Sequence, residues 1–193
     1  MSTLVFVTSA LFGIAAYGYY FRDTKDSNIV PNRWSWLAFG LSSVIEVLTF
    51  NEVSGDPVKS SLFFISAGCC LVVTTLIWSK AKWLRPDWTE LCCFAACMVA
   101  TILWLQFGMA GWGHFIMIVA IPISFIPTYR SAWREWKSED TPAWMLWSVG
   151  DGLAVVFVVL RLEKAEELPY AAVEFLSHLM VWCIVRRGRK ASS

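Results

Sequence analysis

Two apolar segments of this chain open alike, one on PNRWSW at residues 31–36 and the other on PAWMLW at residues 142–147. Each follows a short polar stretch, which comes after YYFR at residues 19–22 and PTYR at residues 127–130. The two copies are offset by 109 residues at Tyr20 and Tyr129 and by 111 at Pro31 and Pro142. The second loop is therefore two residues longer. A duplicated set of helices is typical of many transporters.

The composition places this chain in a membrane. It has 193 residues, of which 57% are hydrophobic and 12 are tryptophan, too much apolar surface for one water-soluble core. The apolar segments approach the length of a membrane-spanning helix, about 20 residues, and lack the alternation of a membrane β-barrel. They lie near residues 4–21, 34–50, 61–79, 88–106, 111–129, 143–162 and 169–185. We therefore expect an all-α membrane protein with seven transmembrane helices.

The repeat divides these helices as 3+1+3 in a single transmembrane domain over residues 1–193. Repeat one covers about residues 3–80, a linker helix covers about residues 88–106, and repeat two covers about residues 110–186. Because one helix separates the repeats, both run in the same direction through the membrane. The sequence thus predicts two parallel three-helix repeats related by a pseudo-twofold axis along the membrane normal.

Basic residues predict the orientation of the helices. With seven spans, one face carries 13 of the 16 Lys and Arg residues, and the other carries only Lys59, Arg161 and Lys164. Basic loops stay in the cytosol, so we expect the N-terminus outside and the C-terminus in the cytosol, in a plasma or bacterial inner membrane. The basic residues are spread over four short segments, which does not favour nucleic acid as a partner. The lipid bilayer is the expected partner, and a homo-oligomer is possible.

Ionisable residues deep in a membrane are costly and usually functional. At about 1.5 Å per residue, Glu46, Asp151 and His178 fall near the middle of their spans. Glu174 precedes His178 by four residues and shares its helix face, where a carboxylate can hold the imidazole proton. These four residues are candidates for substrate binding in a polar cavity. The alternative is that they are packing elements that fix the helix register.

Two further ionisable residues, Glu90 and His114, lie within a turn of their span ends. We expect water to reach both of them there, and we expect both to be structural. Trp36 and Trp147 occupy matching positions in the two repeats, where their rings could stack on a flat solute. An aromatic belt at the membrane interface also explains tryptophans at this depth.

Small and sulfur-containing residues carry weaker signals. Gly150 and Gly152 flank Asp151 and could admit a ligand or another helix backbone. The six cysteines lie in apolar spans without the spacing of a metal site, so we expect them to serve packing. We predict no metal, no cofactor and no catalytic residues, since the chain has no nucleophile elbow, phosphate loop or zinc-protease motif.

The chain resembles the PQ-loop superfamily, which includes the SWEET sugar transporters. The Pro-Gln pair of that family corresponds to Pro127-Thr128 in the second half and Gly18-Tyr19 in the first, so the glutamine is absent from both. Residues 144–151 are also similar to the Trp-x-x-Trp-x-x-x-Asn pattern of the more distant nicotinamide riboside (PnuC-type) vitamin transporters, with Asp151 in place of asparagine. The resemblance implies a small-solute transporter.

These observations together predict a transporter of a small polar solute that is sugar-, nucleoside- or vitamin-like. It would work by alternating access through a central cavity between the two repeats. The candidate substrate-binding residues are Trp36, Glu46, Trp147, Asp151, Glu174 and His178. The alternative is a seven-span sensor or receptor, or a partner-dependent membrane protein without transport activity.

Overall fold

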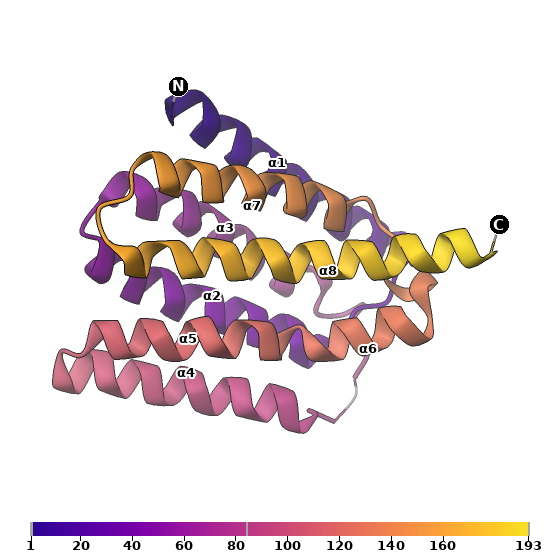
Figure 1. The fold of residues 1–193 in the computed structure, drawn as a ribbon. Coiled ribbons are helices and arrows are strands. Elements are labelled where there is room, and N and C mark those ends of the chain that lie inside the picture. Colours follow the sequence, from indigo (N-terminus) through magenta and orange to yellow (C-terminus); the bar gives the residue numbers. More distant parts are fainter. Residues whose placement is uncertain (1, 84, 193) are drawn as a thin grey trace.

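The computed structural model describes residues 2–83 and 85–192, which form helices joined by short turns (Figure 1). Within these residues, seven helical segments are long and apolar enough to cross a membrane. The α-helices are α1 (Ser2–Lys25), α2 (Arg33–Ser54), α3 (Pro57–Ile77), α4 (Trp88–Phe107), α5 (Ala110–Ser124), α6 (Ile126–Arg134), α7 (Ala143–Leu160) and α8 (Leu168–Ser192). Two short 3₁₀ turns, η1 (Trp136–Glu139) and η2 (Ala165–Glu167), precede α7 and α8. The prediction of an all-α protein with seven membrane-spanning helices is confirmed.

A tight turn folds α3 back along α2. Gly55 ends α2 with φ of 68°, a left-handed conformation that glycine adopts without steric cost. Asp56 then caps α3, because its side chain accepts hydrogen bonds from the backbone N–H groups of Val58 and Lys59. Pro57 stands in the first turn of α3, where its missing N–H is not needed. Helix α3 therefore begins four residues before the predicted span and includes Lys59.

The fifth span is interrupted. The predicted segment 111–129 forms two helices, α5 and α6, that meet at Phe125. Pro122 lies inside α5 and Pro127 lies in the first turn of α6. Each proline removes a backbone donor, which explains a break between them. Together α5 and α6 form the span Ala110–Arg134.

The helices pack as a bundle in which α4 lies at the edge, beside α5 (Figure 1). Helix α1 packs against α7 and α3, and α2 packs against α3, α4 and α5. Gly150 brings α7 close to α1: a Cβ there would lie 3.3 Å from the backbone nitrogen of Gly13 and from the carbonyl oxygen of Ser9. The Ser9 hydroxyl also donates a 2.7 Å hydrogen bond to the Gly150 carbonyl. Gly150 therefore serves helix packing.

The bundle has two distinct ends. We call the end that holds the α1–α2, α3–α4 and α6–α7 connections the basic end, at the right of Figure 1. The opposite end, which holds the α2–α3, α4–α5 and α7–α8 turns, is the hairpin end. Helix α1 starts at the hairpin end, and α8 finishes at the basic end. The two-repeat arrangement and the orientation in the membrane stay predictions.

Candidate functional site

Three predicted site residues meet between α7 and α8. Asp151 projects from α7, and its Oδ2 lies 2.6 Å from Nδ1 of His178 on α8. Glu174, one turn earlier on α8, places its Oε2 3.9 Å from the same nitrogen. The imidazole is therefore within hydrogen-bond distance of Asp151, while Glu174 lies beyond it. Asp151, Glu174 and His178 together are called the polar triad below.

The polar triad borders two small cavities in the middle of the bundle, each of about 30 Å³. The first, called the aromatic cavity, is lined by Trp36, Phe39, Phe125, Trp144, Trp147, His178 and several serines. The second cavity is lined by Ser9, Gly13, Phe63, Asp151 and Tyr170 among others. Tyr17, Ser66, Trp147 and Glu174 line both cavities and form the wall between them. Each cavity has room for a water molecule or two.

The aromatic rings of the wall are in mutual contact. Trp147 stacks on the imidazole of His178, with a centroid distance of 5.2 Å and an interplanar angle of 22°. The ring of Tyr17 meets Trp147 edge-on at 5.0 Å. Trp36, the predicted counterpart of Trp147, lies 6.4 Å from it. The structure thus brings the two tryptophans to one site beside the triad, and both are buried in the protein.

A chain of hydrogen bonds separates the aromatic cavity from a larger opening at the basic end. The indole N–H of Trp36 donates to the Tyr20 hydroxyl at 3.2 Å, and that hydroxyl donates to Oε2 of Glu139 at 3.3 Å. On the far side of these residues lies a vestibule of about 570 Å³. Trp36 lines both the vestibule and the aromatic cavity. These three hydrogen-bonded side chains therefore form part of the vestibule wall, and Trp36 reaches from it to the aromatic cavity.

Glu139 is a buried acid with a raised pKa. It lies in η1, between two membrane spans, and only 5% of its surface is exposed. Burial raises its pKa to about 8, although the hydrogen bond from Tyr20 and the charge of Lys82 act in the opposite direction. The sequence did not single out this residue, because it stands in a polar loop. Its side chain lines the vestibule beside Tyr20.

We expect Glu139 to make stability depend on pH. The fold favours the protonated acid, so the free energy of unfolding should fall as pH rises from the usual value near 4.5 through about 8. Between about pH 4.5 and about pH 8, the melting temperature of Glu139→Gln should fall less than that of the wild type. Glu135→Gln, which changes an exposed acid of the same vestibule, is the matched control and should follow the wild type. Parallel curves for wild type and Glu139→Gln would contradict the assignment.

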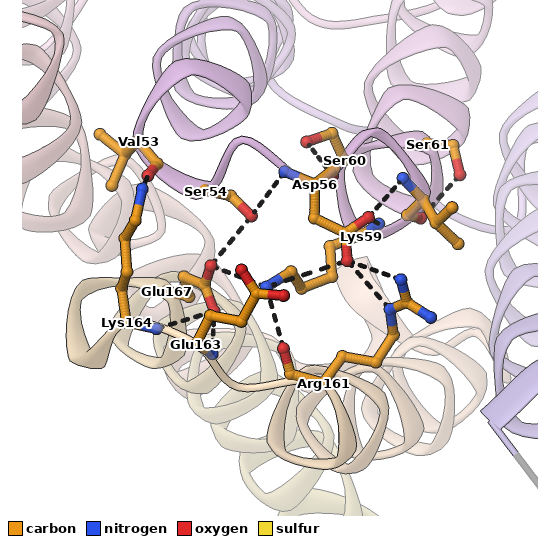
Figure 2. Close-up of polar contacts among 11 residues, drawn as sticks. Val53, Ser54, Asp56, Lys59, Ser60, Ser61, Arg161, Glu163, Lys164 and Glu167 are labelled. Atoms are coloured by element: carbon orange, nitrogen blue, oxygen red, sulfur yellow. Dashed lines mark hydrogen bonds and ion pairs between the residues drawn. The ribbon is translucent and has the colours of Figure 1, made fainter.

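The hairpin end is closed by a buried cluster of charges, shown in Figure 2. Lys59 of α3 is fully buried, and its Nζ lies 2.7 Å from Oε1 of Glu167, which is also fully buried. The same ammonium donates to the Arg161 carbonyl at 2.9 Å. The Arg161 guanidinium in turn binds Oδ2 of Asp56 through Nε at 3.0 Å and through an Nη at 2.8 Å. We call Asp56, Lys59, Arg161 and Glu167 the charged clamp, because they join the α2–α3 turn to the α7–α8 turn.

All three basic residues that the charge count assigns to this face are engaged at the hairpin end, two of them in the charged clamp. Besides Lys59 and Arg161, Lys164 donates a hydrogen bond to the Val53 carbonyl (Figure 2). Burial by itself raises the pKa of Asp56, but the Arg161 guanidinium and two backbone N–H groups outweigh it. The pKa of Asp56 therefore lies below its usual range, as expected for an ion pair that favours the folded state.

Glu46 lies away from the polar triad. Its Oε1 is 2.8 Å from Nδ1 of His114 on α5, and the other ring nitrogen of His114 lies 3.0 Å from the Glu166 carbonyl oxygen of η2. Glu46 is not among the described residues that line either central cavity. His114 is only 2% exposed. The expectation that water reaches it is wrong, because η2 folds over this end of α5.

Glu90 is also buried, contrary to expectation. Its carboxylate accepts from the backbone N–H of Asp87 at 2.6 Å and completes a capping box at the start of α4. It also accepts from Asn32 and from the Ser35 hydroxyl, both at 2.7 Å. These bonds give Glu90 a structural place at the junction of α2 and α4. Burial is tolerated here because its oxygens have partners.

Metal binding finds no support in the described part of the chain. Residues 2–83 and 85–192 contain no group of three or more His, Cys, Asp or Glu side chains able to hold a metal ion. Cys93 instead donates to the Ala120 carbonyl, and Cys97 lies 3.6 Å from the Ser42 hydroxyl. Both thiols pack between helices.

Comparisons with protein-family models, with curated proteins and with solved structures give no match to this chain. Its class therefore follows from its own fold and site. The chain is a seven-span, multi-pass membrane protein with a buried polar site at the centre of the bundle. Besides five of the six predicted residues, Tyr17 and Trp144 line the central cavities. Tyr20 and Glu139 line the vestibule instead.

Proposed function

We propose that this protein transports a small polar solute by alternating access through the centre of the bundle. The observation that carries the proposal is the polar triad, whose members line two cavities in the middle of the bundle. Ionisable side chains at membrane depth are costly and usually line a solute or ion path. The solute would be sugar-, nucleoside- or vitamin-like, with Trp36, Trp147 and the polar triad as its binding residues.

The two ends of the bundle support this mechanism. At the basic end, the vestibule reaches inward as far as Trp36 and Tyr20. At the hairpin end, the charged clamp ties the two helical turns together. Alternating access needs one side closed while the other opens. We assign this structure to a state whose hairpin end is shut and whose centre is sealed from the vestibule by a thin aromatic layer.

The packing of the helices supports two related halves. Helix α1 packs against α7, and α2 packs against the α5 that corresponds to α1 in the second half. Reciprocal contacts of this kind are expected from a pseudo-twofold axis between two repeats. Rocking of one half against the other would then open either end. The excess of basic residues supports a cytosolic basic end, with the N-terminus outside.

A binding screen followed by uptake tests the proposal. The purified protein is heated in the presence of sugars, nucleosides, vitamins or amino acids, because a bound solute stabilises the folded state. The screen is repeated with Asp151→Asn and with the control Glu163→Gln, which alters an exposed loop acid. Each solute that stabilises the wild type is then offered, radiolabelled, to vesicles that contain the protein.

We expect at least one solute to stabilise the wild type and the control but not Asp151→Asn. The same solute should enter protein-containing vesicles faster than protein-free ones. Binding without uptake would contradict transport and favour a seven-span sensor or receptor. A screen without any stabilising solute would contradict a binding role for the polar triad and favour a partner-dependent membrane protein.

A further inference from the structure

We propose that the solute is a small organic monocation whose quaternary ammonium group binds between the carboxylate of Glu174 and the aromatic rings of the central wall. This inference rests on the proposed function, whose solute class it narrows. It is carried by the charges, the aromatic rings and the unpartnered donor of the two central cavities.

Glu174 supplies a carboxylate without a full partner. Asp151 holds the imidazole of His178 at 2.6 Å, whereas Glu174 lies 3.9 Å from it, too far for a hydrogen bond. The Glu174 side chain lines both central cavities. A carboxylate at a cavity wall in low dielectric attracts a cation strongly. A cationic solute would give Glu174 the ion-pair partner that His178 gives to Asp151.

The charges around the cavities favour a cation over an anion. Among the described residues that line the two cavities there is no Lys or Arg, and the one basic group, His178, faces two carboxylates. The basic residues nearest the hairpin end are engaged in the charged clamp. An anionic solute would therefore meet two carboxylates, Asp151 and Glu174, with His178 as the one basic group beside them.

Aromatic rings surround the position that the cation would take. Trp147 and Tyr17 form the wall shared by both cavities together with Glu174. Trp36, Phe39 and Phe125 complete the aromatic cavity. The faces of such rings attract organic cations, and cages of this kind recognise quaternary ammonium groups. The two cavities are small, so they need to expand less to hold a compact ammonium group than to hold a larger, flat solute.

One buried donor indicates what else the solute carries. The indole nitrogen of Trp147 has no hydrogen-bond partner, although the residue is only 3% exposed. A buried donor without an acceptor is costly. An oxygen atom on the solute would satisfy it. The geometry therefore points to a quaternary ammonium compound that carries a hydroxyl or carbonyl group.

Binding of matched probes to the full-length protein in micelles tests the inference. The probes are choline, tetramethylammonium, glucose and 3,3-dimethylbutan-1-ol, which has the shape of choline with carbon in place of the charged nitrogen. Each is titrated by calorimetry into the wild type, Glu174→Gln, Trp147→Phe and the control Glu163→Gln. Thermal unfolding of each variant without probe shows that it is folded.

We expect choline to bind at least about tenfold more tightly than its neutral isostere. Glu174→Gln should abolish this preference, and Glu163→Gln should keep it. Trp147→Phe retains an aromatic face but loses the N–H. It should therefore weaken the binding of choline more than the binding of tetramethylammonium. The inference is overturned if the isostere or glucose binds as tightly as choline, if Glu174→Gln keeps the preference, or if no cationic probe binds.

Uptake separates failure of this inference from failure of the proposed function. If vesicles take up a neutral solute such as glucose and no cationic probe binds, the solute class is wrong and transport stands. A second outcome is that choline binds through Glu174 yet enters protein-containing vesicles no faster than protein-free ones. In that case the binding site stands and the proposal of transport is wrong.

Discussion

Replacement of Lys59 by methionine is expected to lower the free energy of unfolding by about 3–5 kcal/mol, the usual cost of removing one partner of a buried ion pair. The variant leaves the Glu167 carboxylate fully buried without its 2.7 Å ammonium partner. It also removes the donor to the Arg161 carbonyl that holds the α7–α8 turn. Thermal unfolding of the purified protein should show a fall of roughly 10 °C in the melting temperature.

The same cluster offers a matched control and a rescue. Lys164→Met changes an exposed lysine whose ammonium group binds only the Val53 carbonyl among the contacts described (Figure 2). Its effect should stay within about 0.5 kcal/mol. The double variant Lys59→Met with Glu167→Gln leaves no buried charge unpaired, so it should recover most of the loss. A Lys59→Met protein as stable as Lys164→Met would show that the charged clamp does not hold the two turns together.

The charged clamp illustrates how far the sequence predicts this fold. Lys59 and Arg161 stand out in the sequence, because they are two of only three basic residues on their face. Their partners do not, since Glu167 is 108 residues from Lys59 and Asp56 is 105 residues from Arg161. The spans themselves are predictable because lipid forces each backbone to satisfy its own hydrogen bonds. Ion pairs between distant turns depend on how the helices pack, which local sequence patterns do not predict.

In the candidate site, too, the sequence predicts features within one helix but not the contacts between helices. Helical rise predicts the depth of Asp151 and His178, and the four-residue spacing predicts that Glu174 and His178 share a face. The contact between Asp151 and His178 joins two helices, so only the packing of α7 on α8 produces it. Depth alone is also insufficient for Glu46. It lies deep in its span, yet it turns to His114 on α5 and away from both central cavities.

Turns account for the remaining errors. The start of the fifth span looks accessible in sequence, but η2 folds over it and buries His114. The polar loop before α7 looks solvated, yet it carries Glu139 inward to the Tyr20 hydroxyl. Hydropathy treats such loops as water-exposed. Their actual paths over the helix ends are set by caps, prolines and long-range contacts.

Disruption of the pair between Asp151 and His178 is expected to have the largest effect on function. A hydrogen bond to a charged group contributes about 1.5–3 kcal/mol. Uptake by Asp151→Asn or His178→Leu, measured per folded molecule in vesicles, should therefore fall about 10- to 100-fold. Asp151→Asn removes the carboxylate charge from this 2.6 Å contact at the cavity wall, and His178→Leu removes the imidazole. The double variant should then be no worse than the poorer single variant, because the two side chains act as a unit.

A purely structural pair predicts a different pattern. If Asp151 and His178 only fix the register of α7 and α8, the single variants should melt at lower temperature while each folded molecule transports normally. His178→Gln separates the two cases, because its amide can still donate to Asp151 but cannot carry an imidazole proton or stack on Trp147 as His178 does at 5.2 Å. Wild-type stability with lost uptake in His178→Gln supports a functional imidazole. Full uptake in that variant would show that the polar triad requires only a hydrogen bond at this position.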